Sequence, residues 1–350
     1  MFSRVARAEG IATSVRILQK RWTASTVSIE SASIFKKNPI DPELVIPVSC
    51  ALGAEIKQVN ISRPLESEHQ KIIKSALDKF SVLVFRNQPI TGQQMVEGLK
   101  FLGNVAVEQH YVDQGLTLPG CPECFVLKNG ENNPPTFDFW HSDKVSWENP
   151  VQYTVLACKK VPDIGGDTLI SNNRKAFDSL SEGMKNIFRT MNGVYNEKNA
   201  FVNNPKVVSY LKKLGFDPNG VYDRFKDQVH PIVKKNPRNG RESLYFSPPY
   251  FSRMEGFSEE ESRYFQDILL KTVAKPEFVY RHSWQENDII IIDNSATSHY
   301  AVCDYYPQVR EMHRIIITEE KKSFQKTLVV PLENEHQEEN IDSCSRSLTP

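Results

Sequence analysis

Two histidines and one aspartate are the side chains of this sequence best suited to hold a metal ion. His141 and Asp143 are separated by one residue, and positions i and i+2 of an extended segment project from the same face. A His-x-Asp pair alone is a weak signal, because it is frequent by chance and also fits a strand-end histidine bonded to an aspartate. His299 strengthens the hypothesis, since it follows the apolar run Ile289–Ile292 where a strand gives way to a loop. Two histidines and one carboxylate form the facial triad of non-haem Fe(II) oxygenases, although zinc competes for the same ligands.

Two arginines on a later segment are candidates for binding anions. Arg310, Met312 and Arg314 alternate along a predicted strand and therefore share a face. If His299 points inward, a hairpin through the turn at Asp304–Pro307 brings this face back beside it. An interior arginine is costly unless it meets an anion, because its guanidinium stays protonated. The two arginines therefore either form surface ion pairs or bind two carboxylate-like ligands, and the second alternative fits an iron enzyme with a keto-acid cosubstrate.

The composition of the whole chain excludes several classes of function. The 350 residues include 43 Lys+Arg and 43 Asp+Glu, so the formal net charge is zero. A chain with no net positive charge has no overall electrostatic attraction to nucleic acid or acidic membranes. The longest apolar runs are far shorter than the roughly 20 residues of a spanning helix. Six cysteines predict reduced thiols rather than a disulfide scaffold. We expect neither nucleic acid nor a membrane as partner, and leave open whether the chain forms a homo-oligomer.

The two ends of the chain differ in charge. Residues 1–30 are rich in Arg and Ser, poor in acidic residues, and place apolar residues at helical spacing beside a basic face. This composition is typical of a mitochondrial transit peptide, although an ordinary surface helix or a disordered basic arm would share it. We expect a transit peptide at 1–30, a folded domain at 40–325 and a polar acidic tail at 326–350. The expected compartment is the mitochondrion, with the cytoplasm as the alternative.

The elements that must position the candidate side chains are helices and strands in alternation. Helical spacing of apolar residues predicts four helices, over residues 66–80, 91–102, 176–191 and 258–274. Short apolar runs predict strands that include residues 81–85, 243–246, 289–293 and 314–318. The pattern predicts a mainly β fold with flanking helices, an α+β arrangement in which the helices pack outside a sheet-rich core.

With these motifs the sequence resembles the taurine dioxygenase (TauD/TfdA) family of Fe(II)/2-oxoglutarate-dependent dioxygenases. The similarity covers roughly residues 52–318 and includes the run from Trp140 to Asp143. Its most specific parts are the block from Pro162 to Leu169 and the block from Asp293 to Arg314. The resemblance implies a double-stranded β-helix, the jelly-roll or cupin-like core. It also implies an oxidoreductase that uses Fe(II), 2-oxoglutarate and O2, hydroxylates a small anionic substrate and releases succinate and CO2.

The resemblance implies a role for each candidate residue that stands at a matching position of a family motif. The ligands of Fe(II) would be His141, Asp143 and His299. Arg310 would hold the distal carboxylate of 2-oxoglutarate in a bidentate fork, and Thr168 would donate its hydroxyl to the same carboxylate. Arg314 would bind the anionic group of the prime substrate, and Tyr111 aligns with a tyrosine of the family's substrate site.

The match departs from the taurine enzymes in the region that would recognise the substrate. Glu108 stands at the position that we align with a histidine, and Phe137 or Phe139 replaces a polar side chain. A glutamate would repel a sulfonate, which argues against taurine, whereas Arg314 favours another sulfonate, a sulfate ester or a carboxylate. Two alternatives stay open: a carnitine-pathway hydroxylase of trimethyllysine or gamma-butyrobetaine, and a non-catalytic jelly-roll binding protein.

A pair of fluorescent fusions tests the predicted transit peptide. We expect the full chain to co-localise with a mitochondrial marker in eukaryotic cells, because residues 1–30 combine a basic face with an apolar stripe. The same fusion without residues 1–30 should stay in the cytoplasm. An unchanged distribution after the deletion would contradict the prediction.

Overall fold

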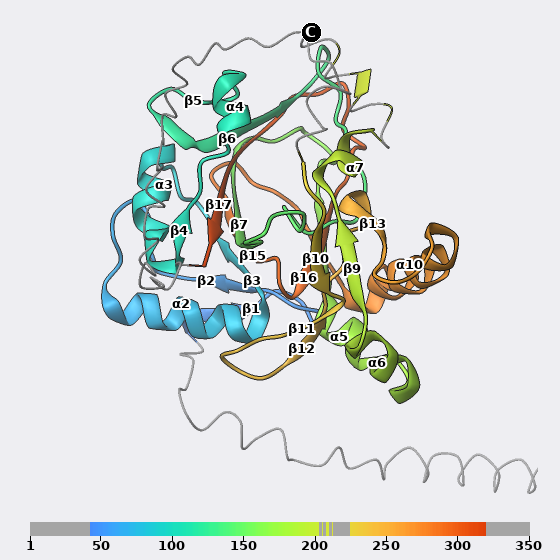
Figure 1. Ribbon diagram of the computed structural model, residues 1–350. Helices are drawn as coiled ribbons and strands as arrows, with labels where there is room; N and C mark the ends of the chain where they lie inside the picture. Colours follow the sequence, from blue (N-terminus) through green and yellow to red (C-terminus); the bar gives the residue numbers. More distant parts are fainter. Residues whose placement is uncertain (1–42, 203–204, 206–207, 210–211, 213–224, 320–350) are drawn as a thin grey trace, which may run out of the picture. The chain divides into compact units, whose positions relative to one another are not determined.

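Two β-sheets that share an apolar interior form the centre of the fold (Figure 1). The computed structural model describes residues 43–319, except 203–204, 206–207, 210–211 and 213–224. The predicted transit peptide at 1–30 and the predicted tail at 326–350 lie outside these residues. Within them, no helix is long and apolar enough to cross a membrane.

The larger sheet has the strand order β1-β2-β3-β15-β7-β17-β6-β5, and β4 pairs with β17 beside this path. Its strands are β1 Val45–Pro47, β2 Ala54–Ile56, β3 Val82–Phe85, β4 Asn104–Val105, β5 Thr117–Leu118, β6 Cys121–Asn129, β7 Val151–Lys160, β15 Ile289–Asp293 and β17 Arg310–Thr318. The smaller sheet has the order β14-β8-β16, with β14 Val279–His282, β8 Thr168–Asn172 and β16 Thr297–Ala301. Outside these two lie the sheets β10-β9-β13 and β11-β12, with β9 Asn192–Tyr195, β10 Gln228–Pro231, β11 Val233–Lys235, β12 Glu242–Leu244 and β13 Phe251–Met254.

The central strand β15 is buried on both faces, which explains why its sequence is a continuous apolar run rather than an alternating pattern. Ile290 and Ile292 join the apolar cluster that also holds Ile170 of the smaller sheet. Ile289 and Ile291 join a second cluster, on the other face, with side chains of the helices that cover the larger sheet. A strand buried on both faces needs apolar residues at every position.

Helices cover the outside of the larger sheet and pack around the smaller sheets (Figure 1). They are α2 Ser67–Phe80, α3 Gly92–Leu99, α4 Gln109–Asp113, α5 Asn173–Asp178, α6 Glu182–Arg189, α7 Glu197–Val202 and α10 Glu259–Val273, with 3-10 turns η3 Lys100–Leu102, η4 Pro248–Tyr250 and η5 Pro276–Phe278. The helices α3 and α10 each begin with a capping box, formed by Thr91 with Gln94 and by Ser258 with Glu261. The described residues therefore form the expected mainly β fold with flanking helices.

Two local expectations were wrong. The helix predicted over 176–191 is divided into α5 and α6, because Ser181 accepts a hydrogen bond from the Met184 amide and so begins a new helix. The hairpin predicted after His299 is also absent, since β16 pairs with β8 in the smaller sheet whereas β17 pairs with β7 and β6 in the larger one. The chain thus crosses between the sheets, and side chains of β16 and β17 meet across the interior.

Candidate active site

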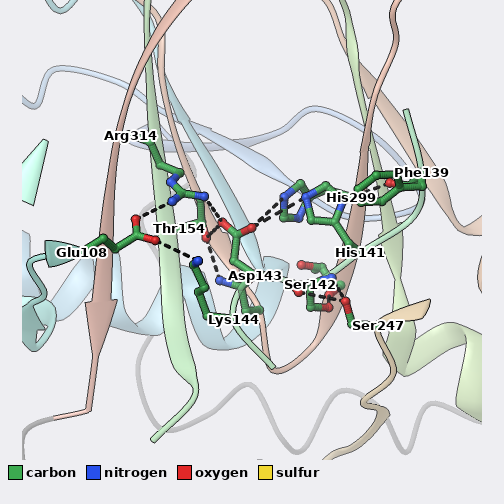
Figure 2. Close-up of polar contacts among 12 residues, drawn as sticks. Glu108, Phe139, His141, Ser142, Asp143, Lys144, Thr154, Ser247, His299 and Arg314 are labelled. Carbon is green, nitrogen blue, oxygen red and sulfur yellow. Dashed lines mark hydrogen bonds and ion pairs between the residues drawn. The ribbon is translucent and has the colours of Figure 1, made fainter. Parts of the chain in front are cut away.

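His141, Asp143 and His299 lie together in the interior between the two sheets (Figure 2). Their potential ligand atoms all lie within 4.8 Å of one another. Two reciprocal backbone hydrogen bonds join the histidines, because the His141 amide donates to the His299 carbonyl at 2.9 Å and the His299 amide donates back at 2.7 Å. His141 is part of an isolated bridge and Asp143 of a turn, so this segment is attached to β16 at a single point.

Both imidazoles present a nitrogen to the same carboxylate oxygen. His141 Nδ1 lies 2.9 Å from the carbonyl of Phe139 and can donate to it, which leaves Nε2 free to bind a metal. The Nε2 atoms of His141 and His299 lie 3.7 and 3.9 Å from Asp143 Oδ1. Burial lowers the pKa of His141, and burial together with the neighbouring His141 lowers the pKa of His299 to about 3. Both rings are therefore neutral near pH 7, the form that binds metals.

The carboxylate of Asp143 is oriented by partners on β7, β17 and the loop after β15. Its Oδ2 accepts a hydrogen bond from Thr154 Oγ1 at 2.7 Å and lies 3.4 Å from Arg314 Nη1. Asn294 completes the arrangement, because it accepts from the Asp143 amide at 3.0 Å and donates to Thr154 Oγ1 at 2.8 Å. Burial raises the pKa of Asp143, but Arg314 and the two histidines outweigh it and hold that pKa well below its usual range. Oδ2 is thus engaged by the protein, and Oδ1 faces the imidazoles.

Ser142 fixes the peptide between His141 and Asp143. Its amide donates to Ser247 Oγ at 3.1 Å, and that hydroxyl donates back to the Ser142 carbonyl at 2.9 Å. The Ser142 hydroxyl donates to the carbonyl of Thr297 at 2.7 Å. Every polar group of Ser142 is therefore satisfied in the interior, so the separation between the two candidate ligands is fixed. The sequence alone did not identify the residues that position the two ligands, because only the fold brings them together. They are Ser142, Ser247, Thr154 and Asn294.

Arg310 on β17 faces Thr168 on β8 across the interior. Arg310 is 7% exposed and donates to the carbonyl of Gly166 at 2.9 Å and to Thr168 Oγ1 at 3.3 Å. Burial lowers the pKa of this guanidinium. Among the ion pairs found in the described residues none involves Arg310, which distinguishes it from Arg314. A buried cation without a carboxylate partner fits an external carboxylate.

Trp284 determines where the hydroxyl proton of Thr168 can point. The Trp284 indole donates to Thr168 Oγ1 at 3.0 Å, and Arg310 donates to the same oxygen. A hydroxyl has two acceptor positions and one donor, so two incoming hydrogen bonds leave the O–H group free to donate elsewhere. Thr168 lines the cavity between the sheets, where it can serve as a donor to a carboxylate. Trp284 belongs to none of the motifs, so nothing in the sequence pointed to it.

Arg314 pairs with a carboxylate of the protein itself. Its Nη2 forms an ion pair with Glu108 Oε2, and Glu108 Oε1 lies 3.1 Å from Lys144 Nζ (Figure 2). Lys144 also binds Glu197 Oε1 at 2.7 Å. Burial raises the pKa of Glu108, but Arg314 and Lys144 outweigh it and lower that pKa. The sequence singled out Arg314 and Glu108 separately, and it gave no sign of Lys144 or Glu197.

Tyr111 lies beside these cations. Its ring stacks on Phe125 with centroids 3.9 Å apart, and Lys144 Nζ and Arg314 Cζ lie 5.5 and 5.9 Å from the ring centroid. One cavity is lined by every residue that the sequence proposed for the site: His141, Asp143, His299, Thr168, Arg310, Arg314 and Tyr111. Its apolar lining includes Leu127, Phe137, Leu156, Ala200, Ala301 and Met312. The cavity therefore combines a candidate metal site, two arginines and apolar walls.

Residues 43–316 match the profile of the taurine catabolism dioxygenase TauD, TfdA family. The chain belongs to this family. As a TauD/TfdA member it is a non-haem dioxygenase that uses Fe(II), 2-oxoglutarate and O2, which agrees with the His-Asp-His cluster and with a buried Arg310.

Curated and solved relatives of this TauD/TfdA protein agree with the assignment. An alkylsulfatase of Acinetobacter baylyi is 28% identical, and the match covers 82% of this chain and 88% of that protein. An alpha-ketoglutarate-dependent sulfate ester dioxygenase of Pseudomonas putida is 28% identical, with 79% and 89% covered. The crystal structure of a taurine dioxygenase from Burkholderia xenovorans is 25% identical, has a TM-score of 0.64 and covers 79% of this chain and 90% of that chain. These comparisons confirm the expected jelly-roll fold.

A Trp284→Phe variant tests how the Thr168 hydroxyl is oriented. We expect the dissociation constant of 2-oxoglutarate to rise about 3- to 10-fold, because one buried hydrogen bond contributes roughly 1 kcal/mol. Anaerobic titration of the iron-loaded protein with 2-oxoglutarate measures it. In a Thr168→Val background the same change should have little further effect, since the two residues act through one contact. Additive losses in the double variant would contradict this interpretation.

Proposed function

We propose that this dioxygenase hydroxylates a small organic anion, and that sulfate esters, sulfonates and carboxylates are the candidate substrate classes. We further propose that His141, Asp143 and His299 are the ligands of Fe(II). The observation that carries the proposal is the convergence of this triad with two buried arginines in one largely apolar cavity. The turnover of one substrate molecule would consume O2 and 2-oxoglutarate and release succinate and CO2.

The residues at the Arg310 end of the cavity would hold the cosubstrate. Arg310 offers a bidentate guanidinium and Thr168 a free O–H donor, and together they suit the distal carboxylate of 2-oxoglutarate. When bound, iron supplies the activation of O2 and the oxidation of a C–H bond. The contribution of the chain is to orient both carboxylates of the cosubstrate and to exclude bulk water from the cavity.

The residues at the Arg314 end would recognise the substrate. Arg314 lines the same cavity as the triad, and apolar side chains such as Leu127 and Phe137 line its walls. This arrangement suits a molecule with one anionic group and an apolar body. Two relatives are named as an alkylsulfatase and a sulfate ester dioxygenase, and alkyl sulfates and other sulfate esters are molecules of this kind. Sulfate esters are therefore our first candidates.

The carnitine-pathway alternative receives less support from the cavity. A trimethylammonium substrate needs aromatic faces that are free to contact it. Of the aromatic residues that line the cavity, Tyr111 is stacked on Phe125 and its ring is already close to Lys144 and Arg314, which leaves Phe137 and Tyr250. These two cations would also repel a cationic group placed beside Tyr111.

Anaerobic spectroscopy tests the proposed metal and cosubstrate site. Addition of Fe(II) and 2-oxoglutarate should produce a metal-to-ligand charge-transfer band in the visible region, because the cosubstrate chelates the metal held by the triad. His141→Ala should abolish the band. His313→Ala is the matched control, since His313 lies on β17, contacts Glu311 and does not line the cavity, so its band should persist. No band in wild-type protein that contains iron would refute the enzyme proposal.

A screen of succinate release across alkyl sulfates, sulfonates and carboxylates tests the substrate class. Arg314→Ala should abolish substrate-stimulated turnover while it leaves 2-oxoglutarate binding within about threefold of wild type, because the hydrogen bonds to Thr168 come from Arg310 and Trp284 and not from Arg314. Arg310→Ala should instead weaken 2-oxoglutarate binding by at least about tenfold, since it removes a charged hydrogen-bond donor. If both variants lose 2-oxoglutarate equally, our assignment of the two arginines is wrong.

A further inference from the structure

Four buried charged side chains form a continuous chain of ion pairs beside the candidate substrate site. We call Arg314, Glu108, Lys144 and Glu197 the charge ladder, in the order of their contacts. The exposed fractions of these residues are 8%, 6%, 2% and 4%, so solvent screens their interactions little. The ladder reaches the proposed metal site at one point, because Arg314 Nη1 lies 3.4 Å from Asp143 Oδ2, and it includes neither Arg310 nor Thr168.

The backbone at Lys144 indicates that the ladder is built in rather than incidental. Lys144 has a φ of 51°, in the left-handed region that non-glycine residues rarely adopt. This conformation directs the side chain that follows Asp143 into the interior, where Lys144 binds Glu197 at 2.7 Å and lies 3.1 Å from Glu108. Residues in rare backbone conformations persist where surrounding contacts hold them, and such residues cluster at functional sites.

The charges of the ladder are balanced before any substrate binds. Two cations, Arg314 and Lys144, alternate with two carboxylates, Glu108 and Glu197. An external anion placed at Arg314 would add a negative charge beside Glu108 in a poorly screened interior. An external anion that takes the Nη2 group of Arg314 therefore competes with Glu108 for it.

Glu108 has a second cation available if it loses Arg314. Its Oε2 pairs with Arg314, whereas its Oε1 lies 3.1 Å from Lys144 Nζ. Glu108 would therefore stay neutralised by Lys144 after an external anion has taken Arg314. Glu197 differs, because it contacts Lys144 and Ser146 and makes no ion pair with Arg314.

We propose that Glu108 is a specificity-determining residue: it occupies Arg314 as an internal anion until the anionic group of the substrate replaces it. The inference rests on the proposed function, since it assumes an anionic substrate at Arg314. Replacement has an electrostatic cost, so an anion without an apolar body binds poorly. A long apolar chain offsets that cost through contacts with the cavity walls. The cavity therefore selects amphiphilic anions over small hydrophilic ones such as inorganic sulfate.

A Glu108→Gln variant tests this inference, with octyl sulfate, inorganic sulfate and the neutral molecule 1-octanol as probes. Glutamine keeps the shape of the side chain and removes its charge. Calorimetry of the protein loaded anaerobically with Fe(II) and 2-oxoglutarate should show that the variant binds octyl sulfate at least about tenfold more tightly than wild type, the scale of a close buried charge pair. Binding of 1-octanol should not change. If Glu108 had only a structural role, its loss would affect the binding of 1-octanol and of octyl sulfate alike.

Glu197→Gln is the matched control. It removes a carboxylate from the same ladder without touching Arg314, so it should not tighten the binding of octyl sulfate. Thermal unfolding gives a second readout, because an anion that binds only the folded state raises Tm. Inorganic sulfate should raise the Tm of Glu108→Gln more than that of wild type, and Glu108→Ala should behave in the same way.

The outcomes separate this inference from the proposed function. If wild type turns over an anionic substrate but Glu108→Gln binds octyl sulfate equally or more weakly, the inference is overturned and the proposed function stands. If no anion stimulates succinate release in wild type or in Glu108→Gln, both are overturned. If the variant binds octyl sulfate and wild type does not, the inference is overturned, because an amphiphilic anion then fails to replace Glu108.

Discussion

The pair of hydrogen bonds between the backbones of His141 and His299 is the constraint on which the candidate site depends. It joins an irregular segment to β16 at a single bridge, and it brings two imidazoles from residues 158 positions apart to a ring-centroid distance of 4.1 Å. With Ser142 tied to Ser247 and Thr297, the turn that follows can present Asp143 in only one direction. The geometry of a potential metal site thus follows from this backbone bridge together with the hydrogen bonds of Ser142 and of the Asp143 carboxylate.

The two buried arginines of β17 show how a protein can use the same side chain in opposite ways. Arg310 keeps hydrogen bonds to a carbonyl and a hydroxyl and lacks an ion pair within the described chain, so its charge remains available. Arg314, four residues further along the same face, is paired with Glu108 and lies close to Asp143. Since neither guanidinium can lose its proton, each must be compensated by some anion. One is suited to an external carboxylate, whereas the other already has an internal partner.

The sequence revealed the parts of the site that depend on local pattern. The spacing of His141 and Asp143, the shared face of Arg310 and Arg314 and the helical periodicity of α3 and α10 are all properties of short segments. It could not reveal contacts that depend on how distant segments meet. The path from β16 to β17 crosses between sheets, which local turn signals could not distinguish from a hairpin. Trp284, Asn294 and Lys144 act through such distant contacts, and none of them stands in a recognisable spacing.

The position of Arg314 connects the two halves of the candidate site. One of its nitrogens lies 3.4 Å from Asp143 Oδ2, and another pairs with Glu108, so a single guanidinium touches both a candidate metal ligand and the charge ladder. Any group that replaces Glu108 therefore changes the electrostatic environment of Asp143 through one planar guanidinium. Lys144, the residue that follows Asp143, holds the other end of Glu108. Recognition of an anion at Arg314 and the electrostatic environment of the metal-facing carboxylate thus depend on one shared guanidinium.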